Sequence, residues 1–324
     1  MPLHDVGYRE WQGETRGDNF RWWVIAWTGI RIAWKNMWLR RMLVAAWLPA
    51  AAFGSLFFFY EQAAMESSVN NDMTRMFVVR VLEHRLNAPR EIVTALRDDP
   101  AEARHTVWSY LLLVFFRNPQ GVMIVLLVGL IAPRLISQDL RSRAHLLYFS
   151  RPLTATEYIL GKLTVLWVFL TGVTTLPAVA LYVLGVLLSP DLSVVWDTWD
   201  IPLRILLASI ALILPTSLLA LAISSLTKES RYAGFAWFVI WVLGSVTYNA
   251  LTSTANIGVS DLQAIDVDRW VLVSPYHILG RAQAWIFAVD VNVRLARNCV
   301  IALCVTTAFS WILLRSRIAS VVRA

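Results

Sequence analysis

Residues 163–190 read LTVLWVFLTGVTTLPAVALYVLGVLLSP, and Tyr182 is the only ionisable side chain among them. A helix that crosses the hydrocarbon layer of a membrane, about 30 Å thick, needs about 20 mostly apolar residues, because every backbone N–H and C=O must be bonded within the segment. This run meets that requirement, and five others along the chain do so as well. We therefore predict an all-α integral membrane protein with six transmembrane helices, at about residues 42–60, 119–136, 163–188, 204–226, 232–253 and 298–314.

The composition of the whole chain agrees with this prediction. Of its 324 residues 57% are hydrophobic and only 16% are charged, and the mean hydropathy is +0.56. These values exclude a soluble globular domain and a disordered chain. Sixteen tryptophans and fourteen phenylalanines are typical of a chain with aromatic residues at both faces of a bilayer. The net charge of +7 fits either a nucleic-acid partner or an anionic membrane surface, so its distribution has to distinguish the two.

The charges fall unequally on the two sides of the predicted membrane. If the six spans alternate in direction and both termini lie on one side, that side carries 17 basic and 7 acidic residues, a net of +10. The other side carries 12 basic and 15 acidic residues, a net of −3. Because basic residues gather on the cytoplasmic side of membrane proteins, we expect both termini in the cytoplasm and the chain in a bacterial plasma (inner) membrane. The positive charge is then a topology signal, and no nucleic-acid partner is expected.

Before the first span the chain has two parts. Residues 1–20 form a polar tail, and residues 21–41, RWWVIAWTGIRIAWKNMWLRR, have the pattern of an amphipathic helix with basic residues opposite an apolar stripe. Such a helix lies in the cytoplasmic interface, with indoles at headgroup level and cations toward anionic lipid. The competing interpretation is a core helix of a small soluble N-terminal domain. The residues that define the interfacial helix are Trp23, Trp27, Arg31, Trp34, Lys35 and Trp38.

Residues 42–324 form the six-span membrane domain, and its largest outer segment is an insertion at 61–118. The pattern predicts a helix that ends before Pro89, a short helix at 89–96 and a third at 101–116. Seven basic residues offset eight acidic ones there, which indicates a small helical cap rather than a charged tail. The sequence leaves open whether this cap binds a ligand or only covers the outer mouth.

The connection between the second and third spans, residues 137–162, has the sequence of a short helix followed by a break. A hydroxyl and an acid near 137–139 are typical of a helix N-terminus. Pro152 stops that helix, and Thr154 with Glu157 forms a capping box for the helix that enters the third span. Such a segment suits docking of a cytoplasmic partner, and the alternative is a connector that touches only lipid headgroups. The candidate docking residues are Ser137, Asp139, Arg141, Arg143, His145, Leu147, Arg151 and Glu157.

The apolar runs lack charged residues apart from Arg134 and Arg204 at their edges, which weighs against an ion-coupled carrier. No catalytic motif and no histidine pair at metal-binding spacing occurs, so we expect no catalytic, cofactor or metal site in this chain. Gly161 and Lys162 are followed by Leu163 rather than Ser or Thr, so they do not form a P-loop. If the protein uses ATP, another chain must hydrolyse it.

Residues 135–163, LISQDLRSRAHLLYFSRPLTATEYILGKL, and the order of the segments resemble ABC-2 type transporter permeases. Within this family the subgroup associated with multi-copper enzyme maturation is the nearest. The motif combines a small residue and an acid, a basic stretch, an apolar pair, a proline after Ser and Arg, and a Gly-Lys pair. The matching residues are Leu135, Ser137, Asp139, Arg141, Leu146, Leu147, Ser150, Arg151, Pro152, Gly161 and Lys162.

The resemblance implies the permease subunit of an ABC transporter, which pairs with a second permease chain, identical or related. Two cytoplasmic ABC ATPase subunits would bind below and hold the ATP and magnesium, with residues 138–149 as the coupling helix and the interfacial helix as the connecting helix. The expected activity is export of cargo by alternating access. Two alternatives stay open on the residues alone, a secondary carrier and a non-transporting scaffold that anchors a partner complex. The sequence does not indicate the substrate.

Overall fold

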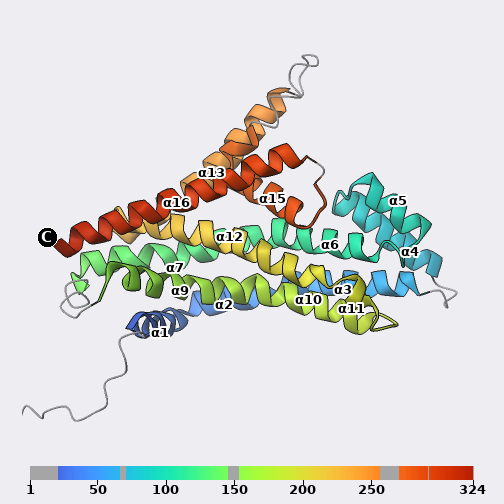
Figure 1. The fold of residues 1–324 in the computed structure, drawn as a ribbon, viewed down its shortest axis with the longest axis horizontal. Helices are drawn as coiled ribbons and strands as arrows, with labels where there is room; N and C mark the ends of the chain where they lie inside the picture. Colours follow the sequence, from blue (N-terminus) through green and yellow to red (C-terminus); the bar gives the residue numbers. More distant parts are fainter. Residues whose placement is uncertain (1–20, 66–70, 145–152, 256–269, 291, 324) are drawn as a thin grey trace, which may run out of the picture.

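The computed structural model describes residues 21–65, 71–144, 153–255, 270–290 and 292–323, and every regular element in these ranges is a helix. The helices form an elongated bundle (Figure 1). The predicted all-α fold is therefore confirmed. The polar tail, residues 1–20, lies outside the described residues.

Six helical segments in the described ranges are long and apolar enough to cross a membrane, which confirms the predicted six spans. In chain order they are α2 (Met37–Ala45) with α3 (Trp47–Ala64), α7 (Gly121–Arg141), α9 (Ala155–Val173) with α10 (Thr175–Leu188), α12 (Asp200–Ser225), α13 (Ser230–Ala255) and α16 (Val293–Arg323). The third is the longest, and Thr174 separates its two helices, α9 and α10.

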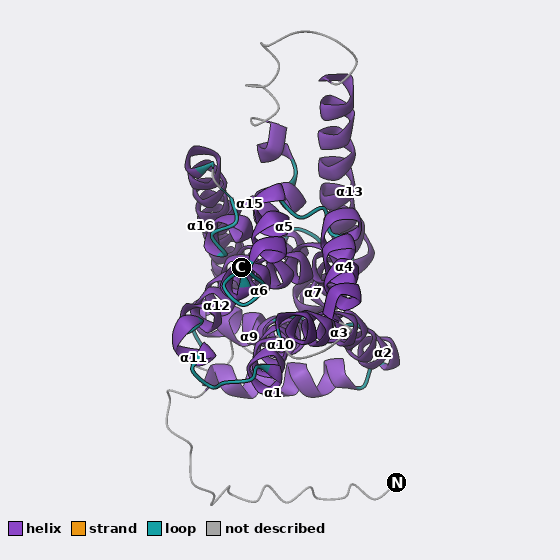
Figure 2. Ribbon diagram, turned by 90° about the vertical axis from the view of Figure 1, so that its right-hand side faces the viewer, coloured by secondary structure: helices purple, strands orange, loops and turns teal. Residues whose placement is uncertain are grey.

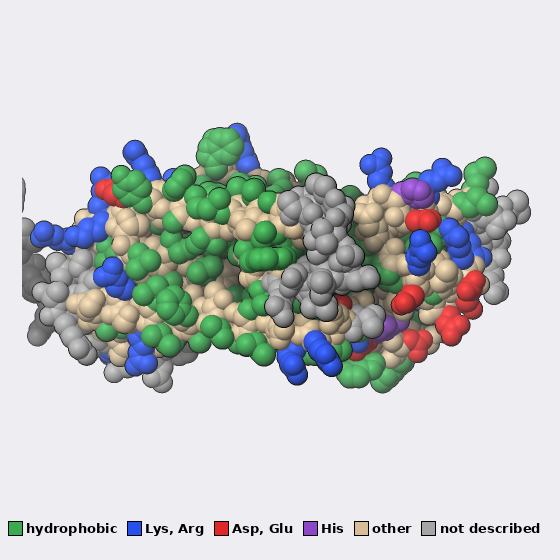
Figure 3. Space-filling model, turned by 90° about the horizontal axis from the view of Figure 1, so that it is seen from above, with side chains coloured by type: hydrophobic (Ala, Val, Ile, Leu, Met, Phe, Trp, Pro, Cys, Tyr) green, Lys and Arg blue, Asp and Glu red, His purple; other side chains and the backbone are tan. Residues whose placement is uncertain are grey.

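Side-chain types are segregated along the bundle. Seen from above, hydrophobic side chains cover the middle of this face, and basic side chains gather at the end that carries the C-terminus (Figure 3). Acidic side chains occur mainly at the opposite end, where they are mixed with basic ones. We call the first of these the basic end: it carries α1, the C-terminal ends of α7 and α12, and the start of α13 (Figure 1). A central apolar band between two charged ends is the surface expected of a membrane protein.

The predicted interfacial helix is divided in two. Helix α1 (Arg21–Trp34) lies across the basic end, roughly perpendicular to the bundle helices (Figure 2). Helix α2 then begins at Met37, and the Asn36 side chain caps it by accepting a hydrogen bond of 3.0 Å from the backbone N–H of Trp38. The single helix expected over residues 21–41 is therefore broken at Asn36, because the chain has to turn from the membrane surface into the first span. Trp38 belongs to that span.

Two glycines let α1 approach α9 closely. A Cβ atom added at Gly161 would lie 2.9 Å from the backbone oxygen of Trp22 and 2.9 Å from Cβ of Ile25. A Cβ atom at Gly29 would lie 2.6 Å from Cγ2 of Val165. Real Cβ atoms do not come so close to other heavy atoms, so a side chain at either position would push the two helices apart. Gly161, the glycine of the Gly-Lys pair in the sequence motif, thus has a packing role.

The outer insertion contains the three helical pieces expected from the sequence. They are α4 (Asn71–Arg80) with a π-helical turn (Val81–Arg85), α5 (Arg90–Asp98) and α6 (Arg104–Phe115). However, nine of the twelve residues of α6 are buried, so α6 is part of the bundle rather than a surface cap. Its Trp108 lies between the rings of Phe57 and Tyr182, at 5.7 and 5.9 Å between centroids.

A π-helical turn (Phe116–Gln120) joins α6 directly to α7, so the two helices follow one line (Figure 1). Pro119 lies in this turn and has no N–H to donate, and a wider helical turn accommodates it without ending the helix. The sequence predicts a boundary between the outer insertion and the second span at these polar residues, 117–119. They therefore do not interrupt the helix.

Three short elements complete the described structure: α11 (Val194–Asp197), the 3-10 turn η4 (Val271–Val273) and α15 (Pro275–Ile286). Helix α15 packs against α12, α13 and α16. Its first turn holds His277, whose ring stacks on Tyr248 with 3.6 Å between centroids and whose Nδ1 lies 2.9 Å from Oγ of Ser274. Burial, followed by the nearby guanidinium groups of Arg117 and Arg281, lowers the pKa of His277 to about 4.

We expect His277 to make the protein less stable in mild acid. The unfolded imidazole takes up a proton near its ordinary pKa of 6.5, but the folded one only near 4, so stability falls as the pH drops through this window and is kept above it. Thermal unfolding of the wild type and of His277→Gln, between about pH 7 and about pH 4.5, measures the effect. The variant should lose less stability than the wild type on acidification, and equal losses would refute the assignment.

Candidate functional site

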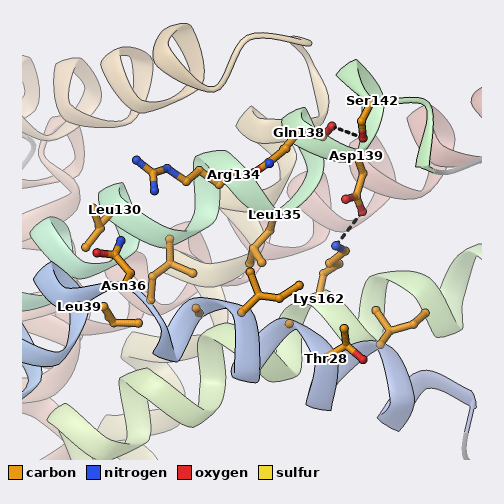
Figure 4. A pocket seen from close by; sticks show the side chains of 15 residues that line it. Thr28, Asn36, Leu39, Leu130, Arg134, Leu135, Gln138, Asp139, Ser142 and Lys162 are labelled. Atoms are coloured by element: carbon orange, nitrogen blue, oxygen red, sulfur yellow. Dashed lines mark hydrogen bonds and ion pairs between the residues drawn. The ribbon is translucent and has the colours of Figure 1, made fainter.

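The two ends of the sequence motif meet in a buried ion pair at the basic end. The Nζ atom of Lys162 on α9 lies 2.7 Å from Oδ2 of Asp139 in the last turns of α7, and their side chains are only 8% and 15% exposed (Figure 4). The hydroxyl of Tyr158, one turn before Lys162, donates to the same carboxylate oxygen at 2.7 Å. The C-terminal end of α7 is thus bound to the N-terminal part of α9, close to the connection between the two helices.

A second polar contact binds α7 to α12. The Ser224 hydroxyl accepts from the backbone N–H of Ser137 at 3.1 Å and donates to the carbonyl of Pro133 at 3.1 Å. It thus contacts both backbone groups of an i, i−4 pair of α7. The Ser137 hydroxyl in turn donates to the backbone oxygen of Ser224 at 2.7 Å, and both serines are fully buried.

The prediction that a new helix begins at Ser137 is wrong. Helix α7 continues without interruption through Arg141, and Ser137 lies inside it and bonds Ser224 of α12 instead of capping a new helix. Ser137 and Asp139 thus face neighbouring helices of the bundle, whereas the sequence placed them on a surface that docks a partner.

Arg141 and Arg143 lie at the exposed end of α7. The guanidinium of Arg141 contacts Oε2 of Glu229, in the connection between α12 and α13, at 3.1 Å. The side chains of this pair are 68% and 43% exposed, so the pair contributes little to stability. Arg143 is exposed in the turn after α7 with φ of 55°, a backbone conformation that ends the helix. Both arginines are therefore accessible to a partner.

The capping box predicted at the start of α9 is present. Oγ1 of Thr154 accepts from the backbone N–H of Glu157 at 3.2 Å, and the Glu157 carboxylate accepts from the backbone N–H of Thr154 at 2.8 Å. Glu157 is thus used to begin the helix. The remaining candidates, His145, Leu147 and Arg151, lie outside the described residues.

The residues predicted to define the interfacial helix are exposed in the structure. They are Trp23, Trp27, Arg31, Trp34, Lys35 and Trp38. The indoles of Trp23 and Trp27 stack with 6.3 Å between centroids, and Trp34 stacks on Phe169 of α9 at 6.2 Å. The buried face of α1 is formed instead by Ile25 and Ala26.

The sequence does not predict the roles of three residues that bind these helices together. They are Lys162 and Tyr158, which contact Asp139, and Ser224, which contacts Ser137. Each contact joins positions far apart in the sequence, so helical periodicity does not reveal it. Pro133 has no N–H and so frees the carbonyl of Gly129, whereas Ser224 bonds the Pro133 carbonyl, so the proline does not predict this contact.

Three of the six spans are joined to one another at the basic end. Helices α7, α9 and α12 are bound together at the basic end by buried polar contacts, and the exposed Arg141 and Arg143 lie at the end of α7 beside them. The fold and site thus define an integral membrane protein of six spans with a surface suited to a partner at its basic end.

Comparison with protein families identifies it further. The family model described as ABC-2 family transporter protein matches residues 31–317, nearly the whole chain, so the protein belongs to this family. It is accordingly the membrane subunit of an ABC transporter. A search among curated proteins finds no match.

Proposed function

We propose that the protein is an exporter subunit in which a separate ATPase drives alternating access through the basic end. Cytoplasmic ABC ATPase subunits bind the connection between α7 and α9 and hold the ATP and magnesium, while this chain holds neither. Closure of the ATPase pair pushes on the connection and reorients the bundle. Family membership supports the general role, and the geometry of the basic end supports the point of contact.

The buried pair of Asp139 and Lys162 is the observation that carries this proposal. It joins the C-terminal end of α7 to the N-terminal part of α9, the two helices that the connection links, with 2.7 Å between the charged atoms. Ser224 extends the link to α12. A loop that only touched lipid headgroups would not require buried ionic and hydrogen-bonded anchors at its two ends, since burying charges is costly.

The proposal also includes the orientation and the second permease chain. The net charge of +10 on the side of the termini favours a cytoplasmic basic end in the plasma membrane. The C-terminal end of α13 projects from the rest of the bundle (Figure 1), and α13 and α16 expose apolar side chains such as Phe235, Val242 and Phe309. A second copy of this chain or a related one, together with lipid, would cover these faces.

Reversing two charges on the connection tests the proposal. In the variant Arg141→Glu with Arg143→Glu, we expect cargo-stimulated ATP hydrolysis by the reconstituted complex to fall roughly tenfold, because the partner loses two attractive charges. The matched control is Arg315→Glu with Arg317→Glu, which makes the same change in charge on exposed residues of α16 at the same end of the bundle but outside the connection. Both variants should fold normally, since all four side chains are exposed.

The outcomes separate the candidate functions. Loss of coupled hydrolysis in the first variant alone supports the proposal, and unchanged hydrolysis in both variants contradicts it. Transport driven by an ion gradient without any ATPase would identify a secondary carrier. A purified complex that binds partners but stimulates no ATP hydrolysis would identify a scaffold.

A further inference from the structure

Two adjoining cavities open at the basic end and share part of their lining. The first, about 430 Å³, lies among α1, α2, α7 and α9. The second, about 600 Å³, lies between the end of α7 and the start of α13. Arg134, Gln138 and Ser142 of α7 line both of them. Arg134 therefore borders both cavities, which we together call the hollow.

Arg134 extends along α7 toward Leu130 instead of toward the charged end of the helix (Figure 4). Side chains on a helix lean toward its N-terminus, and here this direction carries the guanidinium past the apolar part of the first cavity. Within the described ranges no ion pair or hydrogen bond is made by this guanidinium. A cation that points toward the apolar layer without an anion is unfavourable, so the position calls for an anionic ligand.

The other charges around the hollow do not neutralise Arg134. The carboxylates of Asp139 and Glu229 are already engaged with Lys162 and Arg141, respectively. Lys228 lines the second cavity and, like Arg134, contacts no carboxylate of the described residues. Arg134 and Lys228 thus remain without a carboxylate partner among the described residues, and both line the second cavity.

The first cavity has the lining of a site for an amphiphile. Its apolar side chains are Ile25, Ile32, Leu39, Leu130, Ile131 and Leu135. Gln138 and Ser142 join Arg134 toward the end of α7, and the polar side chains of Thr28 and Asn36 also line the cavity. Helix α1, which lies across the basic end with its indoles exposed, places this boundary at the level of lipid headgroups (Figure 2). A free phosphate would leave the apolar part of the lining in water.

We propose that this hollow binds one anionic phospholipid from the leaflet at the basic end. Its phosphate lies between Arg134 and Lys228, where a guanidinium can form two parallel hydrogen bonds to phosphate oxygens. One acyl chain lies against Leu130, Ile131 and Leu135 beside α1. The lipid thereby joins α1 and α7 on one side to the start of α13 on the other, and this role is separate from ATPase docking.

Native mass spectrometry of the full chain in detergent tests this site. The protein is titrated with phosphatidylglycerol or with phosphatidylcholine of the same acyl chains. We expect the wild type to retain one phosphatidylglycerol in preference to phosphatidylcholine. In Arg134→Gln the affinity for phosphatidylglycerol should fall roughly tenfold, because a charged hydrogen-bonding group is lost, and Arg134→Lys should lose less.

Two further variants keep the test decisive. Arg40→Gln removes an exposed arginine from α2 at the same end without touching either cavity, and it should bind phosphatidylglycerol like the wild type. Lys228→Gln alters an exposed residue, so it should fold normally and also weaken binding. If Arg134→Gln and Lys228→Gln both retain the lipid like the wild type, or if the wild type shows no preference, the proposal is wrong. Displacement of the lipid by excess inorganic phosphate would overturn it in favour of a free phosphate.

Discussion

Replacing Asp139 by Asn is expected to lower the free energy of unfolding by about 3 kcal/mol. The substitution leaves the ammonium group of Lys162 buried without its partner, and breaking buried ion pairs typically costs about 3–5 kcal/mol. We expect the lower part of that range, because the neighbouring cavity brings water close to the pair. Thermal and denaturant unfolding of the purified chain in one detergent measures the loss.

A comparison within the same end of the bundle controls this result. Glu229→Gln breaks the exposed pair with Arg141 and should cost less than about 1 kcal/mol. The double variant Asp139→Leu with Lys162→Met removes both buried charges and should recover most of the stability lost by Asp139→Asn. A double variant as unstable as the single one would mean that the ion pair is not the source of the loss.

Ser224→Ala is expected to destabilise the protein by about 2–3 kcal/mol. The change removes the acceptor of the Ser137 N–H and the donor to the Pro133 carbonyl, and each buried group left unpaired costs about 1–3 kcal/mol. The loss is less than the sum of these two costs, because the Ser137 N–H and the Pro133 carbonyl can bond each other within α7 when the hydroxyl is absent. The same unfolding measurements apply.

The neighbouring serine provides a matched control. Ser225 is also buried, but its hydroxyl donates only to the Ala222 carbonyl of its own helix, at 2.7 Å. Ser225→Ala should therefore cost less than about 1 kcal/mol. If both alanine variants lose the same stability, the contact between α12 and α7 is not specific. Ser224→Ala should also reduce coupled ATP hydrolysis, because it frees α12 from the base of the connection.

Local features of the sequence predicted the spans and one helix cap correctly. Apolar runs of sufficient length define the spans, because the membrane imposes one length on every helix. The capping box of Thr154 and Glu157 was also predictable, since its residues are three apart and depend on no other helix. These features require only neighbouring residues.

The failures concern contacts between distant segments. Ser137 has the local signature of a helix cap, but it lies inside α7 and bonds Ser224 of α12. The sequence assigns residues 101–116 to a small helical cap, yet α6 is buried and joined to α7 by the π-helical turn at Pro119. Similarly, the pairing of Asp139 with Lys162 depends on how α7 and α9 pack. The periodicity of a single helix does not predict any of these three contacts.

The most direct test of the central claim is a crosslink from the connection itself. A photoactivatable amino acid at Arg143, in the exposed turn after α7, is compared with one at Arg97, on exposed α5 at the opposite end of the bundle. Irradiation of intact cells followed by sequencing of the captured chains identifies the neighbours of each position. The account predicts that position 143 captures a subunit with a P-loop and that position 97 does not. Capture of that subunit from position 97, or of no such subunit from position 143, would contradict it.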